Sequence, residues 1–482
     1  MAFFHGARAS EVDTSLLATV STTAGLPVVF GTAPVHLTSD PGKYVNKPII
    51  CYSWNEAVAA LGYSEDWDKY TLCEAMFSEF KLYAVKPIVF VNVLDPAKHK
   101  TEVSADEKVV SGKKILLNEP VLLASLVVKA TADAETPAVL NTDYTAAYDD
   151  DGQLIITVLD GGALDGATSV FLDYVKIDPA QVDSGDIIGG ASADGSVKGL
   201  ELLDSIYNML SLVPGVVAAP GWSEDPTVAA VMKAKCLNIS ELFRCICLTD
   251  VDTKQVTAYT DVNAWKNRNN YTGTNQVVCW PAVRNGDMVF HMSTHIMGII
   301  GVTDAKNLDV PYQSPSNCSM QITGLCLADG TEVNLSLPQA NLLNSQGIMT
   351  GLNFSGGWKS WGNYTGAYPG TTDVKDCFIC VRRMFDWQYQ VFILTYWSQV
   401  DQPLTPRLIK KIVDSESIRL NGLVSRGYML GAEIKFLEDE NPTTDLLAGI
   451  IRFHSYITPP VPAQEIDDIF EYDVNNFKRL FS

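Results

Sequence analysis

The sequence predicts an α/β domain with a parallel sheet, interrupted by an all-β module and followed by an α+β domain that ends in an extended strand. Apolar runs such as "LPVVFGTAP" and "KPIVFVNVLDP" alternate with helix-period segments on both sides of residues 101–198. Such alternation is typical of a parallel sheet covered on both faces. Residues 101–198 show only strand and turn patterns, and two long helix-period segments precede two strands after 376.

The first part of the α/β domain contains two predicted helices with capping signals. "SWNEAVAALG" places Ser53 and Glu56 as a capping box, and "TLCEAMFSEF" repeats this spacing with Thr71 and Glu74. The returning strand is "KPIVFVNVLDP".

The second part resumes the alternation after the β module. It continues with "GLELLDSIYNML" as helix, "GVVAAPG" as strand, a helix beginning at Pro226 and capped by Asp225 or Ser223, "FRCICLTDV" as strand, "DTKQVTAYTDVNAWKN" as helix and "QVVCWPAV" as strand.

The β module is acidic. Residues 101–198 hold 17 Asp and Glu against 6 Lys and Arg, which leaves −11 of the chain's net charge of −21. Turn sequences such as "DDDG" and "DGGALDG" separate its apolar runs. We therefore expect a separate module inserted into one α/β domain.

The last domain begins near Asp376. "VRRMFDWQYQVFILTYW" and "PRLIKKIVDSESIRLNGLV" are expected to be helices, and "EIKFLED" and "GIIRFHSYI" strands. After three prolines, "IDDIFEYDV" alternates as a strand with one apolar face.

These patterns divide the chain into six segments. They are an N-terminal extended arm (1–20), the first part of the α/β core (21–100), the inserted acidic β domain (101–198), the main α/β domain (199–375), the C-terminal α+β domain (376–464) and a C-terminal strand arm (465–482).

Composition argues against several functional classes. The net charge of −21 would repel nucleic acid and anionic lipid. No apolar run reaches the roughly 20 residues of a membrane helix, and the first residues lack the pattern of a signal peptide. We expect no nucleic-acid partner, no membrane insertion and synthesis in a cytoplasm.

The cysteines and histidines offer weak metal patterns. Cys245 and Cys247 form a C-x-C and Cys377 and Cys380 a C-x-x-C, but their apolar surroundings favour buried core thiols over a zinc site. His291 and His295 are spaced like a metal pair on a helix, without the glutamate of H-E-x-x-H. We expect no metal, no cofactor and no catalytic residue.

Several stretches, in their order and spacing, resemble contractile tail sheath proteins of bacteriophages and phage-tail-like injection particles. They include "GLPVVFGTAPVHL", "VKPIVFVNVLDPAKH", "AAPGWS", "CWPAV", "VPYQSPSN", "NSQGIMTGLNFSGGWKSWGNYT" and "GYMLGAEIKFLEDENPTTDLLAGIIRFHSYITPPVPAQEI". The resemblance implies a subtilisin-like α/β core without protease activity, an outer insertion of the β-sandwich kind at 101–198 and a C-terminal domain against an inner tube.

The residues of a subtilisin active site are missing from the sequence. A subtilisin site needs Asp, His in H-G-T and Ser in G-T-S, but the chain's His-Gly pair is His5-Gly6 and it has no Gly-Thr-Ser. This supports a protein that is not an enzyme.

The resemblance implies that terminal arms pair with strands of neighbouring subunits. The expected arm residues are Phe3, Phe4, Arg8 and Val12 near the N-terminus and Ile466, Ile469, Phe470, Tyr472 and Val474 near the C-terminus. A strand with unpaired backbone groups is a template for such pairing. The residues alone equally allow the C-terminal strand to fold back as an edge strand of its own domain.

The implied function is a structural subunit of a contractile sheath that drives a tube through a bacterial envelope with free energy stored at assembly. Its partners are further copies in a helical homopolymer of six-fold rings, the inner tube protein, and the baseplate and tail terminator. It is assembled in the host bacterial cytoplasm and resides in a virion tail or tail-like particle. Arg407, Lys410 and Lys411 are the expected tube contacts, because a helix of this domain lines the tube in the family.

Two rival interpretations remain at this point. The first is an enzyme, either a hydrolase or a thiol or metal site built from Cys245, Cys247, Cys377 and Cys380. The second is a non-contractile structural protein of a baseplate or shell, which the same arms could also build.

Overall fold

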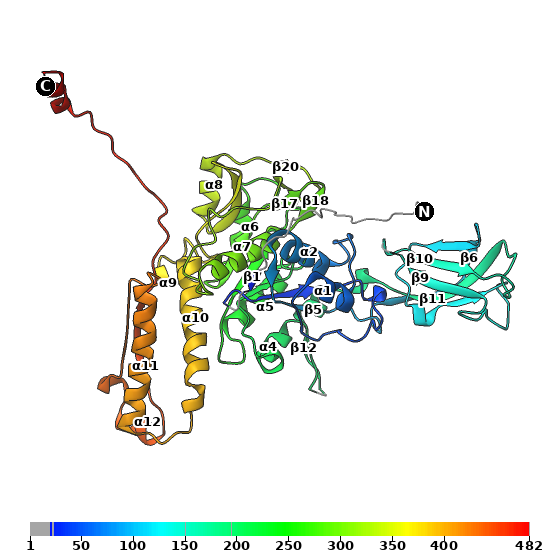
Figure 1. The fold of residues 1–482 in the computed structure, drawn as a ribbon, viewed down its shortest axis with the longest axis horizontal. Coiled ribbons are helices and arrows are strands. Elements are labelled where there is room, and N and C mark those ends of the chain that lie inside the picture. Colours follow the sequence, from blue (N-terminus) through cyan, green and yellow to red (C-terminus); the bar gives the residue numbers. More distant parts are fainter. Residues whose placement is uncertain (1–19, 22–23, 150, 194, 482) are drawn as a thin grey trace, which may run out of the picture.

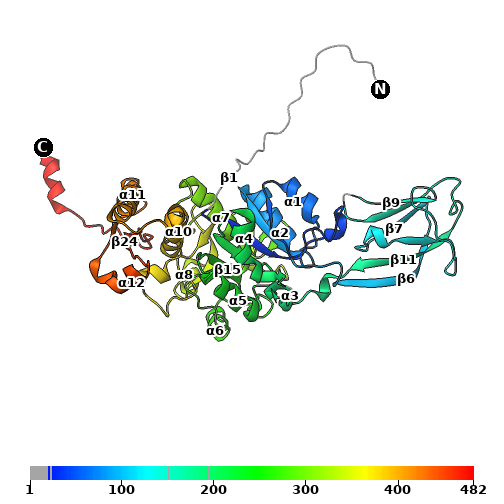
Figure 2. The ribbon, with the colours of Figure 1, turned by 90° about the horizontal axis from the view of Figure 1, so that it is seen from below.

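The computed structural model describes residues 20–21, 24–149, 151–193 and 195–481. The molecule is elongated, with the β module at one end, the α/β domain in the middle and a helical hairpin at the other end (Figures 1 and 2). The expectation of a mixed α/β architecture with several sheets is confirmed.

The α/β domain is built on one large sheet. Within the described residues its order is β22-β21-β16-β15-β14-β2-β5-β3. The six inner strands are parallel, whereas the edge strands β3 and β22 are antiparallel to their neighbours. The strands are β2 Pro27–Gly31, β3 Ile49–Cys51, β5 Ile88–Asn92, β14 Val216–Ala218, β15 Ile246–Asp250, β16 Gln276–Cys279, β21 Ile348–Asn353 and β22 Trp358–Trp361.

Both faces of this sheet are covered. Val277 and Cys279 belong to one apolar cluster, and Val278 between them belongs to another. Because successive side chains of a strand point to opposite faces, the two clusters lie on the two sides. The helices of the domain are α1 Trp54–Leu61, α2 Thr71–Phe77, the π-helix η2 Ser78–Tyr83, α4 Leu203–Leu210, α5 Pro226–Leu237, α6 Val262–Arg268, α7 Met292–Lys306 and α8 Leu337–Asn344.

Two of the predicted helix starts are confirmed and one is wrong. Ser53 caps α1 by accepting from the backbone N–H of Glu56, and Asp225 caps α5 by accepting from the N–H of Thr227 at 2.8 Å. In α2, Thr71 is the first helical residue and not the cap. The carboxylate of Glu74 reaches α7 instead, because tertiary packing offers it donors there.

The expected strand "QVVCWPAV" is divided between two sheets. β16 ends at Cys279, and β17 begins at Ala282 after Pro281, which has no N–H for a sheet. An antiparallel sheet of order β18-β17-β19-β20 follows, which sequence analysis did not predict. Its strands are β17 Ala282–Asn285, β18 Met288–Phe290, β19 Gly324–Cys326 and β20 Glu332–Val333.

The inserted module consists of two antiparallel sheets around one apolar cluster. In the described residues the sheets have the orders β7-β10-β9 and β6-β11-β8. Ile115 and Ile156 of the first sheet share the cluster with Val128 and Leu172 of the second, which makes the module a sandwich. The strands are β6 Lys100–Val109, β7 Lys114–Leu117, β8 Val127–Lys129, β9 Tyr144–Tyr148, β10 Leu154–Val158 and β11 Ser169–Ile177.

The sandwich ends at Ile177, earlier than the expected boundary at 198. Helix α3 (Ser184–Ile188) and the short pair β12 (Gly190–Ala191) and β13 (Val197–Lys198) follow. Val182 and Ile187 join the core cluster of the α/β domain.

The C-terminal domain contains the two expected helices and two expected strands. Helices α10 (Ile379–Tyr396) and α11 (Pro406–Ser425) form the hairpin in Figure 1, and β23 (Gly431–Lys435) pairs with β24 (His454–Thr458). Met384, Leu420 and Ile434 share one buried cluster, so the helices and the strands form one unit. The remaining helices are α9 Val374–Cys377 and α12 Thr443–Leu447. Within the described ranges, no helix combines the length and apolar character needed to cross a bilayer.

Candidate assembly segments and a buried polar cleft

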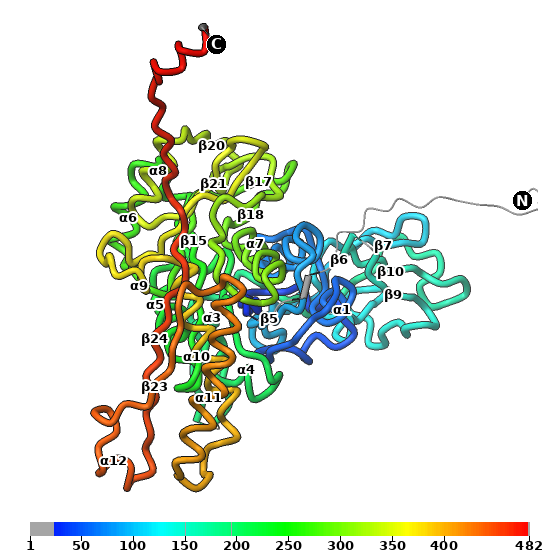
Figure 3. The backbone as a smooth tube through the Cα atoms, turned by 60° about the vertical axis from the view of Figure 1, so that its left-hand side comes forward, coloured from blue at the N-terminus to red at the C-terminus, as the bar shows by residue number. Residues whose placement is uncertain are grey.

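The C-terminal segment leaves the body of the molecule after β24. It runs outward and ends beyond the rest of the chain (Figure 3). Ile466 and Phe470 are each 89% exposed and Ile469 is 86% exposed, and Tyr472 and Val474 are also exposed. Such a row of unburied large apolar side chains is typical of a site that binds another molecule.

This segment is not a strand within its own chain. Residues 459–473 belong to no helix, strand or turn, and η8 (Val474–Phe481) is a 3-10 helix. In the described part of the chain it pairs with no strand of its own domain, so the fold-back alternative is not what the structure contains. Pro459, Pro460 and Pro462 separate it from β24 and remove backbone donors.

The predicted N-terminal arm residues Phe3, Phe4, Arg8 and Val12 lie outside the described residues. The described part of the N-terminal region begins with β1 (Val20–Ser21), which pairs in parallel with β4 (Val85–Lys86).

The β23–β24 pair has two open edges. In the described residues each strand is hydrogen-bonded only to the other. An open edge presents a row of unpaired N–H and C=O groups, to which a further strand can bind. Helix α11 packs against β23, and between them lies a groove of about 650 Å³ lined mainly by apolar residues.

The predicted basic residues lie together on the first turns of α11. Arg407, Lys410 and Lys411 are all exposed, and Nζ of Lys411 donates to Oε1 of Gln399 at 2.9 Å. Lys410 also lines the groove beside β23. The structure therefore brings these three cations to one exposed helix end.

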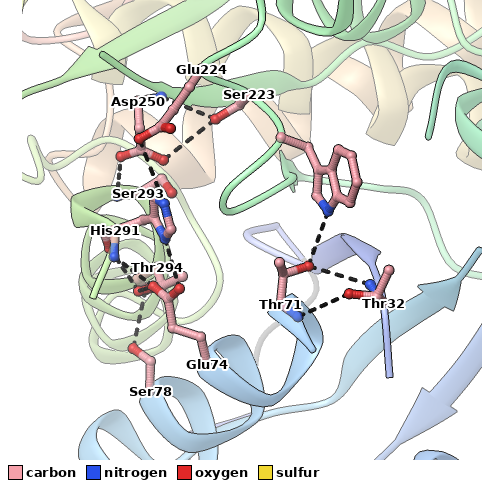
Figure 4. A network of polar contacts seen from close by, with 11 residues as sticks. Thr32, Thr71, Glu74, Ser78, Ser223, Glu224, Asp250, His291, Ser293 and Thr294 are labelled. Atoms are coloured by element: carbon pink, nitrogen blue, oxygen red, sulfur yellow. Dashed lines mark hydrogen bonds and ion pairs between the residues drawn. The ribbon is translucent and has the colours of Figure 1, made fainter. Parts of the chain in front are cut away.

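A polar cleft opens at the carboxyl ends of the parallel strands, where α/β domains usually bind ligands. It has a volume of about 580 Å³ and is lined by carboxylates that include Glu74, Glu224 and Asp250, together with His291. Figure 4 shows how α2, β15 and α7 bring these side chains together.

The His291 ring is held by carboxylates. Its Nδ1 lies 2.7 Å from Oε2 of Glu74, and its Nε2 lies 3.6 Å from Oε1 of Glu224. Glu74 also accepts the backbone N–H of His291 at 2.6 Å, and Asp250 accepts that of Ser293 at 2.9 Å. The two carboxylates thus satisfy the first N–H groups of α7, where negative charge is favoured.

Burial and charge shift the protonation of this cluster in opposite directions. Burial alone would lower the pKa of His291, but Glu74, Glu224 and Asp250 raise it to about 10. Burial raises the pKa of Glu224 to about 7, against the attraction of His291. Burial also raises the pKa of Asp250. The imidazole is therefore a half-buried cation at neutral pH.

This arrangement lacks the chemistry of a serine hydrolase. A catalytic histidine must accept a proton from a nucleophile. Here a charged imidazole is placed between carboxylates, and in the described residues its ring atoms bond only to these. Its evident role is to join α7 to α2 and to the loop after β14.

The other histidine of the predicted pair is separate from this cluster. His295 is fully buried, and its Nδ1 lies 2.9 Å from the hydroxyl of Tyr83. Burial lowers the pKa of His295 to about 3, so the ring is neutral. His291 and His295 thus have different partners and do not act as a pair.

The cysteines lie in the core. Cys245, Cys247, Cys377 and Cys380 are all buried free thiols, and burial raises the pKa of Cys380 to about 12, whereas a metal ligand or nucleophile needs a thiolate. Across the described ranges, no group of three or more His, Cys, Asp or Glu side chains is placed to hold a metal.

Sequence reasoning did not find the polar cleft. Glu74 and His291 are 217 residues apart, and neither Glu224 nor Asp250 stands in a known motif. One sequence feature could have indicated the cleft: the apolar strand that ends in Asp250. Polar residues at the carboxyl ends of parallel strands lie at the same edge of the sheet.

Comparison with known proteins identifies relatives over the whole chain. No protein-family model matches it. The tail sheath protein of Burkholderia phage BcepMu is 28% identical over 484 residues, covering 96% of this chain and 95% of the relative. The tail sheath protein of Escherichia phage P2 is 25% identical, covering 72% of this chain and 83% of the relative.

Solved structures share the fold. The contracted helical sheath of the anti-feeding prophage matches with a TM-score of 0.57 at 15% identity, covering 97% of this chain and 99% of that one. The contracted sheath complex of the extracellular contractile injection system PVC matches with a TM-score of 0.56 at 13% identity, covering 99% of both chains.

An elongated chain of several sheets, with an exposed apolar end and full-length similarity to assembly subunits, defines the class of structural polymer-forming proteins. Over nearly its whole length the chain is similar to phage tail sheath proteins, and it shares its fold with sheath subunits of contractile particles. It is a structural subunit of a contractile sheath.

Proposed function

We propose that the chain polymerises as stacked six-membered rings around an inner tail tube and contracts to drive that tube through a bacterial envelope. The exposed apolar C-terminal segment is the observation that carries this proposal. It has no partner in the described parts of its own chain, so a second copy is needed to bury Ile466, Ile469 and Phe470.

The arm acts by adding a strand to a neighbour. Its backbone from 463 to 473 is outside any sheet, while β23 and β24 each have one open edge. Strand addition satisfies both sets of backbone groups and buries the apolar face of the arm. The N-terminal residues Phe3, Phe4, Arg8 and Val12 have the same role in this proposal.

The energy for contraction comes from assembly. An extended lattice is formed first and is metastable, and a compact lattice with better-matched contacts follows. A difference of a few kcal/mol per subunit, the size of an ordinary allosteric coupling, accumulates over a long polymer.

The C-terminal domain faces the tube in this proposal. Arg407, Lys410 and Lys411 lie on an exposed helix end, and exposed charges make contacts that release readily. The sandwich lies at the opposite end of the molecule and would face outward (Figure 2).

The α/β domain is a subtilisin-like scaffold without protease activity in this proposal. The parallel inner strands with both faces covered support the likeness. The carboxylate-bound His291 supports a non-enzymatic role, as do the absent sequence motifs. The chain needs no cofactor.

The further partners are the inner tube protein, the baseplate and the tail terminator. The site of assembly is the cytoplasm of a host bacterium, and the site of function is a virion tail or tail-like particle. The phage relatives and the contractile particles of similar fold support this assignment.

Electron microscopy of the recombinant chain tests the proposal. A sheath subunit forms hollow cylinders in two lengths, whereas a baseplate or shell component forms discs or closed shells. A chain that ends at Gln464 is expected to stay unassembled. If this shortened chain forms cylinders that still contract, the arm does not have the proposed role.

A further inference from the structure

The groove between α11 and β23 is an apolar surface next to an open strand edge. Helix α11 contributes Ile409 and Val413 to its walls, and the β23 side contributes Ile434 and Phe436. Ile434 is buried, whereas the other three side chains are only half-buried. A strand added to the edge of β23 would therefore bury apolar side chains in addition to pairing its backbone groups.

The two faces of β23 differ in chemistry. Ile434 points into the buried cluster beneath the strand. Glu433 and Lys435 point to the other face, because side chains alternate along a strand. Both are exposed, and Nζ of Lys435 lies 2.9 Å from Oε2 of Glu433. A strand beside β23 would thus turn one face to the groove and the other to this pair of charges.

The C-terminal arm has two faces of the same kinds. In an extended strand, Ile466, Phe470 and Tyr472 lie on one face, and Asp467 and Glu471 lie on the other. All five side chains are exposed in the free chain. The apolar face of the arm matches the groove, and the acidic face matches Lys435.

The charges of the arm and of the groove are also opposite overall. Residues 465–473 contain five carboxylates and no Lys or Arg. The charged residues that line the groove are Lys410 and Lys435, both positive. Opposite charges attract two partners and exclude wrong ones. The chemistry therefore identifies an acidic, partly apolar strand as the occupant of the groove.

The arm that fits this groove belongs to a second copy of the chain. The arm leaves β24 at Thr458, which pairs with Gly431 at one end of β23, whereas the groove lies near Lys435 at the other end. From Thr458 the arm runs away from α12, which follows the groove end of β23 (Figure 3). The arm of the same chain thus points away from its own groove.

We propose that the groove between α11 and β23 binds the C-terminal arm of a second copy, which adds to the edge of β23 with Phe470 and Tyr472 in the groove. Ile469 lies beside Glu433, so that a carboxylate of the arm, Asp467 or Glu471, lies beside Lys435 and like charges do not meet. This inference rests on the proposed exchange of arms. It adds which of the two open edges takes the arm and which residues recognise it.

Binding of a labelled peptide of residues 465–475 to the full-length chain tests the site. The chain is kept at a concentration at which it does not assemble, and fluorescence anisotropy measures the affinity. The peptide should bind, and Phe470→Ser in the peptide should weaken binding about tenfold or more because its apolar burial is lost. A peptide of the same composition in scrambled order is the control. No binding of the unchanged peptide would overturn the proposal.

A change in the groove should have the same effect as the change in the peptide. Ile409→Ser should weaken binding about tenfold. Ile418→Ser is the matched control, since Ile418 lies on the same helix, is 75% exposed and does not line the groove. Equal affinities of the folded Ile409→Ser and Ile418→Ser chains would show that the arm binds elsewhere.

A charge reversal tests the pairing with Lys435. Lys435→Glu should weaken binding about fivefold or more, because an attraction becomes a repulsion. Glu471→Lys in the peptide should recover the affinity if the arm runs parallel to β23, and Asp467→Lys should do so if it runs antiparallel. Recovery with neither peptide would refute the pairing.

Failure of this inference and failure of the proposed function are distinguishable. Peptide binding is measured on single subunits and does not depend on polymerisation. If the chain that ends at Gln464 does not assemble and the peptide does not bind, the site is refuted and arm exchange stands. If that shortened chain forms contracting cylinders, arm exchange is refuted whatever the peptide does.

Discussion

The parallel sheet buries its apolar side chains, whereas the C-terminal arm exposes them. Every residue of β2, β5 and β15 is buried, whereas Ile466 and Phe470 are almost fully exposed. Burying one such side chain contributes about 1.5–3 kcal/mol. The sheet gains this within one chain, and the arm can gain it only against another molecule. Folding of the subunit and joining of subunits therefore depend on different residues.

The charged groups differ in the same way. Asp304 and Arg383 are buried and paired, and the buried Glu74 is paired with the half-buried His291. The arm carries Asp467, Asp468 and Glu471 on exposed positions. Charges in the body join its helices, while those of the arm keep its free form in water.

The largest expected effect comes from removing the arm. A chain that ends at Gln464 should unfold with a free energy within about 0.5 kcal/mol of the full chain, since the lost residues touch little of the body. It should form no cylinders. Urea unfolding and electron microscopy measure the two effects. A chain that ends at Asn475 keeps the arm and is the control for truncation itself.

Substitutions in the core should lower the free energy of unfolding of the subunit. Asp304→Ala leaves Arg383 buried without its partner and should lower the free energy of unfolding by about 3–5 kcal/mol. Asp66→Ala, which breaks the exposed pair with Lys69, should cost less than about 1 kcal/mol. Urea unfolding compares them, and equal losses would contradict the assigned difference in burial.

Single apolar changes in the arm should weaken assembly without affecting folding. Phe470→Ser should raise the concentration needed for polymerisation about tenfold or more, because about 1.5–3 kcal/mol of burial between subunits is lost. Its unfolding curve should match that of the unchanged protein. Asp468→Asn, on the same segment, is the control. Sedimentation of polymers at graded concentrations measures the effect.

The polar cleft should make the stability of the body depend on pH. The pKa of Glu224 in the folded chain is about 7, above its usual value near 4.5. Its contribution to the free energy of unfolding is therefore fully present below about pH 4.5 and is lost as the pH rises through 7. Glu224→Gln should therefore stabilise the chain by up to about 3 kcal/mol at pH 8 and change little at pH 4.5. Thermal unfolding at both pH values measures this, and an equal shift at both would contradict it.

The smallest expected effect concerns the basic end of α11. Replacing Arg407, Lys410 and Lys411 together by glutamine should leave folding unchanged and weaken binding to the inner tube, most clearly at low salt. Arg426→Gln at the other end of the helix is the control. Co-sedimentation with tubes at two salt concentrations measures the difference.

The sequence predicted the elements that depend on neighbouring residues. Continuous apolar runs predicted β2, β5 and β15, and helical spacing predicted α10 and α11. The caps at Ser53 and Asp225 were also predictable, because a cap involves residues only two or three positions apart. The alternation from Ile466 to Val474 predicted a strand after the prolines, whereas the structure has irregular, exposed backbone up to Asp473.

Only the tertiary structure decided which distant residues meet. The capping spacing of Thr71 and Glu74 gave the wrong partner, since packing of α2 against α7 offered Glu74 stronger donors in His291 and Thr294. Other features likewise depend on contacts across the fold: the end of the sandwich at Ile177, the cleft around Asp250 and the hydrogen bond between Tyr364 and Gln464. Local patterns encode periodicity and chain reversal, whereas these contacts depend on how the sheets and helices pack, which no short window of sequence contains.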